Sequence, residues 1–150
     1  MYTTVLFLHS WIRWAALAAG LLATISAFGK GPAALARAES WGFKLMIALD
    51  LQMLLGLLLY GMLSPFTRQA MQDFGGAMRD PVLRFWAVEH LTMMLGAVIA
   101  VHVGRVLARK TASPEKKRTK LLICFSISLL LMLGGMPWPG MPSGRPLFRM

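Results

Sequence analysis

Two of the three histidines of this 150-residue chain lie in one apolar stretch, together with a glutamate. Residues 85–104 would form a helix about 30 Å long at ~1.5 Å per residue, enough to cross a bilayer. Yet the stretch contains Glu89, His90 and His102. An ionisable side chain at the centre of a spanning helix costs roughly 2.5–3.5 kcal/mol on insertion scales, so these residues are functional-site candidates.

The remaining histidine, His9, is predicted to meet one of the other two. If the chain crosses the membrane four times, its first and third helices place His9 and His90 in the same outer half. His102 lies about 18 Å further along its helix and about 120° around it from His90. Two imidazoles from different helices at one depth are what bis-histidine haem ligation requires, and such cofactors sit in helical bundles. We therefore predict one haem b, with His9 and His90 as its iron ligands.

Charged and small residues near this pair are consistent with a haem site. Arg13 lies one turn beyond His9, and Arg84 lies one and a half turns before His90, so each is a candidate partner for a propionate. Glu89 adjoins His90 and is predicted to pair with one of these arginines. On the first helix, Ala16 is small enough to leave room for a porphyrin.

A second, inner site is an alternative prediction. Met46 lies about as far from the inner end of its helix as His102 does from the end of its own, so a histidine–methionine haem is geometrically allowed. Asp50, one turn from Met46, is the rival partner for His102. We favour the reading in which Asp50 hydrogen-bonds His102 and no cofactor is held there.

The elements that must position these residues are predicted to be helices of one all-α membrane domain over residues 1–150. The chain is 57% hydrophobic with a mean hydropathy of +0.59, too apolar for an ordinary soluble domain. Asp80 and Pro81 are a favourable N-cap and first helical residue. The predicted elements are four helices over about 4–28, 41–63, 81–109 and 121–136, an interfacial segment over 64–79 ended by Gly75-Gly76, and a non-helical tail over 137–150.

Basic residues set the predicted orientation of this four-helix bundle. Ten of the sixteen Lys and Arg residues lie in or beside the links between the first two and the last two helices. The positive-inside rule therefore makes both links cytoplasmic and both termini external. The net charge of +10 is therefore explained by these loops, which would lie beside membrane lipid, and we do not predict a nucleic-acid partner. The ten residues are Lys30, Arg37, Lys44, Arg105, Arg109, Lys110, Lys116, Lys117, Arg118 and Lys120.

Several other kinds of site are disfavoured by the sequence. Cys124 is the single cysteine, so no intrachain disulfide forms, and no Cys-x-x-Cys-His motif for covalent haem attachment is present. No phosphate-binding loop, His-Glu-x-x-His, Gly-x-Ser-x-Gly or dinucleotide fingerprint occurs. No catalytic residue is therefore predicted.

Three segments resemble small bacterial four-helix membrane proteins loosely labelled cytochrome b. The resemblance implies haem b, electron transfer and a multi-pass location in the bacterial inner (cytoplasmic) membrane. The implied partners are a quinol or membrane dehydrogenase as donor, an external acceptor, and possible membership of a larger respiratory complex as an oxidoreductase subunit. The segments are Leu8-His9-Ser10-x-x-Arg13-Trp14, Glu89-His90 with His102-Val-Gly-Arg105, and Gly134-Gly135-Met136-Pro137-Trp138-Pro139.

Two alternatives to a cytochrome remain open on the sequence. The first is a copper-binding or copper-transport protein that uses His9, His90 and outer methionines, because thioethers and imidazoles favour Cu(I). The second is a structural subunit that holds no cofactor, with methionine acting as a flexible core filler. The outer methionines are Met62, Met71, Met78, Met93, Met94, Met136 and Met141.

Overall fold

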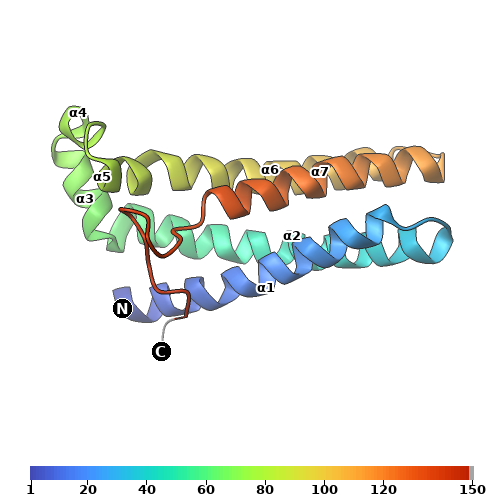
Figure 1. Cartoon of the computed structure of the whole chain (residues 1–150), viewed down its shortest axis with the longest axis horizontal. Coiled ribbons are helices and arrows are strands. Elements are labelled where there is room, and N and C mark those ends of the chain that lie inside the picture. The colour runs from blue at the N-terminus through green and yellow to red at the C-terminus, as the bar shows by residue number, and fades with distance from the viewer. Residues whose placement is uncertain (149–150) are drawn as a thin grey trace.

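The computed structural model describes residues 1–148, which form helices and connecting segments and contain no strand; the last two residues of the predicted tail lie outside this range. Four long helical segments run side by side (Figure 1). They are α1 (Tyr2–Phe28), α2 (Pro32–Leu58) continued by the π-helical turn η1 (Leu59–Leu63), α5 (Pro81–Arg84) continued by the π-helical turn η2 (Phe85–Glu89) and α6 (His90–Arg109), and α7 (Pro114–Gly134).

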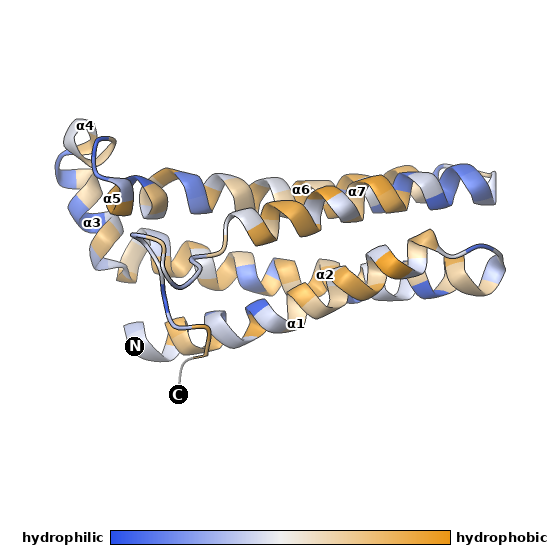
Figure 2. Cartoon of the chain, in the orientation of Figure 1, coloured by the Kyte–Doolittle hydropathy of each residue, from blue (hydrophilic) through white to orange (hydrophobic). Residues whose placement is uncertain are grey.

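Three of these segments are long and apolar enough to cross a membrane: Tyr2–Phe28, Pro32–Leu63 and Pro81–Arg109. The predicted fourth span forms α7, but the first turns of α7 carry most of the basic residues of that link. Its apolar part, from Leu121 to the end of the helix, is about 21 Å long at ~1.5 Å per residue. Figure 2 shows apolar colour along the middle of the long helices and polar colour near their ends.

Two predicted helix starts were wrong, because residues assigned to links extend the helices. The second helix begins at Pro32 rather than 41, after Gly31 with a φ of 85°. Pro is favoured at the first helical position and the next turns are alanine-rich, so the helix continues outward. The fourth begins at Pro114 rather than 121, where Ser113 caps it. Hydrogen bonds from its own backbone N–H and from the Ser113 hydroxyl lower the pKa of Glu115.

The predicted interfacial segment 64–79 is two short helices rather than one. Helix α3 (Pro65–Gln72) begins at Ser64, whose hydroxyl accepts from the Thr67 N–H at 3.3 Å. Helix α4 (Phe74–Ala77) contains both glycines that were predicted to end the segment. The break lies instead at Asp73, whose carboxylate accepts from the Gly76 N–H at 2.9 Å and so caps the new helix.

Small residues let the long helices pack closely. A Cβ added at Gly42 would lie 2.1 Å from Phe125, and one added at Gly104 would lie 2.4 Å from the Cβ of Cys124. The buried Ser128 hydroxyl donates to the Ala97 carbonyl at 3.0 Å and joins α7 to α6. These contacts hold α2 and α6 closely against α7.

The N-terminus, the described part of the tail and helices α3 to α5 lie at one end of the molecule, and both basic links lie at the other (Figure 1). This arrangement agrees with the predicted grouping of the links. The tail that follows α7 is non-helical, as predicted, and in Figure 1 it runs back across the terminal end. That end contains the candidate site.

Candidate functional site

A cavity of about 120 Å³ lies at the terminal end, between α1, α2 and α6 and beneath the tail. Its lining runs from Tyr2 to Leu17 along α1, about 22 Å at ~1.5 Å per residue. The walls are mostly apolar. Their polar members are Tyr2, His9, Ser10, Arg13, Gln52, Tyr60, Ser64, Thr67, His90 and Arg145.

His9 from α1 and His90 from α6 meet in this cavity, as their helix positions predicted. The centres of the two imidazole rings are 6.2 Å apart and the ring planes are inclined at 67°. Metal–imidazole nitrogen bonds are about 2.0–2.1 Å, as for zinc, and a ring centre lies about 1.1 Å beyond its nitrogen, so two imidazoles on opposite sides of one ion have centres about 6 Å apart. The separation therefore suits two axial ligands.

His90 is oriented by the segment that follows α7. Its Nδ1 lies 2.7 Å from the Gly135 carbonyl oxygen, and since a carbonyl only accepts, Nδ1 carries the hydrogen. In the neutral ring, Nε2 is then the nitrogen with a lone pair for a metal. Ligating histidines usually donate their other N–H in this way. Phe85 and Trp86 pack against the ring, with centres 5.8 and 5.5 Å away.

A π-helical turn precedes His90 directly. Residues of η2 lead into α6, and the His90 N–H bonds to the Phe85 carbonyl five residues earlier. Turns of this kind recur at functional sites because they re-aim side chains relative to a regular helix. The second such turn, η1, also borders the cavity through Leu59 and Tyr60, and the Tyr60 hydroxyl donates to the Ala87 carbonyl at 2.9 Å.

His9 sits in a cradle provided by α2. Its Nδ1 is buried and makes no hydrogen bond, a state that costs roughly 1–3 kcal/mol unless a ligand satisfies it. A Cβ added at Gly56 would lie 3.3 Å from the Cε1 of His9, so the glycine leaves the ring its space. The Gln52 side-chain nitrogen donates to the His9 carbonyl at 2.9 Å, which fixes α1 against α2 at this level.

Of the predicted charged residues, the structure brings only Arg13 to the cavity. Arg13 donates to the Leu147 carbonyl at 2.8 Å. Arg84 instead donates to Glu89 at 2.6 Å on an exposed surface, and neither lines the cavity. The two are five residues apart, and the π-helical turn between them places them on one face.

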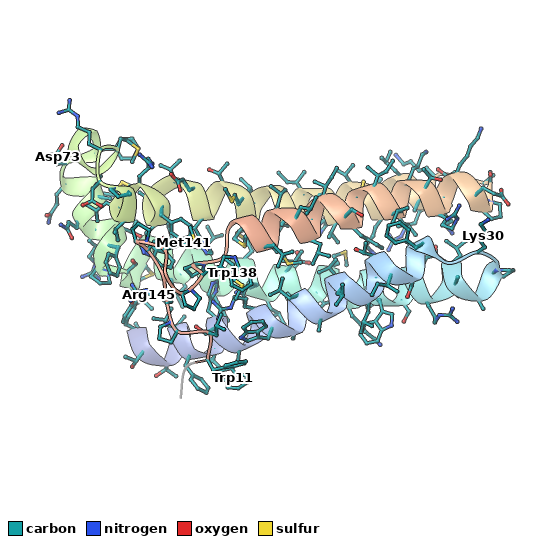
Figure 3. The ribbon with its side chains drawn as sticks, viewed as in Figure 1. Trp11, Lys30, Asp73, Trp138, Met141 and Arg145 are labelled. Carbon is teal, nitrogen blue, oxygen red and sulfur yellow. The ribbon has the colours of Figure 1, made fainter. Side chains whose placement is uncertain are left out.

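The second cation at the cavity, Arg145, was missed by the sequence reasoning. Its guanidinium lies 4.8 Å from the ring centre of Phe66 and 5.3 Å from that of Trp86. Figure 3 shows Arg145 in the tail, at the cavity end of the molecule and far from Lys30. Its position depends on how a Pro- and Gly-rich tail folds back, and such a tail has no periodicity from which to predict it.

The inner candidates are arranged differently. His102 Nε2 and Asp50 Oδ1 are 3.6 Å apart, and both side chains are about two-fifths exposed, at 44% and 40%. Met46 is half-buried and packs against the main hydrophobic core. The structure thus brings His102 near Asp50, at a distance longer than that of the predicted hydrogen bond.

Two imidazoles that face one cavity are the donor set that a bis-histidine haem takes from a protein, because the porphyrin supplies the other four nitrogen ligands. Within residues 1–148, no three His, Cys, Asp or Glu side chains form a group that could hold a metal ion. At about 10–15 Å³ for each water, the cavity holds on the order of ten waters, so side chains would have to move to admit a porphyrin. Met53, Met94 and Met132 line the cavity, and methionine side chains are flexible.

No protein-family model matches the chain, and no curated protein or solved structure is significantly similar to it. The functional assignment therefore rests on the geometry of the cavity and on the chemistry of its residues.

Proposed function

We propose that this protein is a b-type cytochrome, an integral membrane four-helix bundle with one haem b in its outer half. The observation that carries the proposal is the pairing of His9 with His90 across the cavity, with ring centres 6.2 Å apart. Two further observations support the proposal. The buried Nδ1 of His9 has no hydrogen-bond partner. The Nδ1 of His90 donates to the Gly135 carbonyl, which leaves the lone pair of the neutral ring on Nε2.

Each residue of the cavity has a role in this proposal. His9 and His90 would hold the haem iron, and the Gly135 carbonyl orients the His90 ring. Arg13 and Arg145 would supply positive charge to the anionic propionates. When bound, the haem supplies one-electron redox chemistry. The chain would pass electrons from a quinol or membrane dehydrogenase to an external acceptor, as an oxidoreductase subunit in the inner membrane.

The purified protein tests this proposal directly. A reduced-minus-oxidised spectrum is expected to show the bands of haem b, and the pyridine haemochrome is expected to give one haem per chain. Two haems per chain would show that the Asp50–His102 region also holds one. A colourless protein, purified from cells supplied with haem precursor, would contradict the assignment.

One observation favours copper as the second candidate. Met94 and Met136, two of the outer methionines, line the same cavity as His9 and His90, so thioether and imidazole donors gather there. Elemental analysis of the same sample separates the two proposals: about one copper per chain without haem bands favours a copper protein. Neither haem nor copper would leave a structural subunit.

A further inference from the structure

Two arginines lie one turn apart on α6 at the basic end of the molecule, on the side that faces α2. Arg105 reaches across to α2, where it donates to the Glu39 carbonyl at 3.1 Å and its guanidinium lies 5.2 Å from the ring centre of Phe43. Arg109 follows four residues later and therefore lies on the same face of the helix. Two positive charges thus stand side by side where α2 and α6 meet.

Within residues 1–148, no carboxylate pairs with either of these two charges. The carboxylate of Glu39 lies 2.7 Å from the Nζ of Lys117 and so forms its ion pair with α7. Glu115, at the start of α7, accepts from the Ser113 hydroxyl at 2.9 Å. Side chains of like charge at a spacing of four residues repel each other, so an anion that binds between the two arginines relieves that repulsion.

Both arginines retain hydrogen-bond donors for such an anion. A guanidinium has five N–H donors, and the Glu39 carbonyl takes a hydrogen from only one nitrogen of Arg105, Nη1. No described group accepts from Nη2 or from the buried Nε of Arg105. The Arg109 side chain is exposed and makes no hydrogen bond to the described residues. Because guanidinium groups bind two phosphate oxygens at once, the pair suits a phosphate group.

An exposed apolar surface continues from the two arginines towards the middle of α2 and α6. Arg105 lies four residues, about 6 Å, from the end of the apolar segment Pro81–Arg109, which is the level where headgroups meet a spanning helix. A free phosphate makes no use of the apolar surface, whereas the acyl chains of a phospholipid lie along it. Its four side chains are each 43–52% exposed: Phe43 and Ile47 on α2, and Ile99 and Val106 on α6.

We propose that Arg105 and Arg109 bind the phosphate of an anionic phospholipid, whose acyl chains lie along the apolar surface between α2 and α6. Basic sites between helices at the cytoplasmic side bind anionic headgroups in this way. A zwitterionic lipid fits less well, because it brings a cation to a place that already holds two. The site rests on the proposed membrane insertion and not on the haem, since neither arginine lines the cavity.

Native mass spectrometry of the purified protein, released from detergent micelles, tests this site. The probes are dioleoylphosphatidylglycerol and dioleoylphosphatidylcholine, titrated separately, and the anionic lipid is expected to bind more tightly. Arg109→Gln removes a side chain without partners in the protein, so the fold should be kept. This variant should weaken binding of the anionic lipid about ten-fold, as expected for one lost hydrogen bond between charged groups. Arg105→Gln should weaken it at least as much.

Arg37→Gln is the matched control, because it makes the same charge change at the same end of the molecule. Arg37 is exposed and lies two residues before Glu39, on nearly the opposite side of α2, so lipid binding should be unchanged. An equal loss in this control would show that the lipid responds only to the overall charge of the basic end, and would overturn the site.

Two further results would also overturn the proposal. One is equal binding of the two lipids. The other is displacement of the anionic lipid by inorganic phosphate but not by sodium chloride at the same ionic strength, which would leave a site for free phosphate. Haem spectra of the same samples report the cavity independently, so selective lipid binding without haem would contradict the cytochrome and keep this site.

Discussion

Two histidines on one helix, His90 and His102, have the same local chemistry and different surroundings. Each donates its Nδ1 hydrogen to a backbone carbonyl, so Nε2 is the ring nitrogen that faces the opposite group. The carbonyl at His90 is that of Gly135, 45 residues away, whereas the carbonyl at His102 is that of Val98, one turn earlier. His90 is thereby tied to the tertiary structure of the cavity, and His102 only to its own helix.

The group that faces each Nε2 completes the contrast. A second imidazole, that of His9, faces His90 inside a cavity, where the proposed haem would be held. A carboxylate, that of Asp50, faces His102 on a surface that leaves both side chains about two-fifths exposed. The two histidines thus differ in burial and in the group that lies opposite each ring.

The largest predicted difference concerns which side of the membrane each region faces. Single cysteines at Met141 and at Ala112, placed in a Cys124→Ala chain, should react oppositely with an impermeant thiol reagent on intact cells. Position 141 is expected to be labelled and position 112 protected, because the positive-inside rule predicts that the basic links face the cytoplasm. Labelling of position 112 from outside would reverse the assignment of outer and inner regions.

A glycine substitution tests whether the outer cavity is a fitted site. Gly56→Val places methyl groups against the His9 ring, which a Cβ alone already approaches to 3.3 Å. Overpacking costs about 1–3 kcal/mol, so haem binding should weaken by about 5- to 150-fold. Haem content of the purified variant measures this. Gly61→Val is the matched control, since nothing lies within 4 Å of a Cβ there, and its haem content should be that of the wild type.

A smaller effect is expected from the cation that the tail brings to the cavity. Arg145→Ala removes a positive charge that favours the reduced, less positive iron, so the midpoint potential should fall by tens of millivolts, about 1 kcal/mol at one electron. Redox titration of the haem bands measures the change. Arg84→Ala is the control, because Arg84 pairs with Glu89 outside the cavity, and an equal fall there would contradict the assigned roles.

The smallest effect is predicted for the inner region. Asp50→Asn should leave the haem spectrum and the midpoint potential unchanged, since Asp50 does not line the cavity. A shifted haem spectrum in this variant would show that the two regions are not separate sites.

Much of this contrast could be predicted from the sequence, because it depends on helical rise alone. Counting residues along apolar helices placed His9 beside His90 and set His102 apart from both. It could not predict Arg145, since a Pro- and Gly-rich tail has no period to count. It left open whether Glu89 pairs with Arg13 or Arg84, and the π-helical turn, which brings residues five apart onto one face, pairs it with Arg84. The link before α2 was misread because its alanines after Pro32 favour helix as strongly as any apolar run.

The most direct test of the account is the electron paramagnetic resonance spectrum of the oxidised protein and its three histidine variants. The wild type should show a single low-spin ferric haem signal. His9→Ala and His90→Ala should each lose it, to high-spin iron or to haem-free protein that still elutes as a helical species, whereas His102→Ala should retain it. A low-spin signal that persists in both His9→Ala and His90→Ala would contradict the central claim that this pair holds the haem.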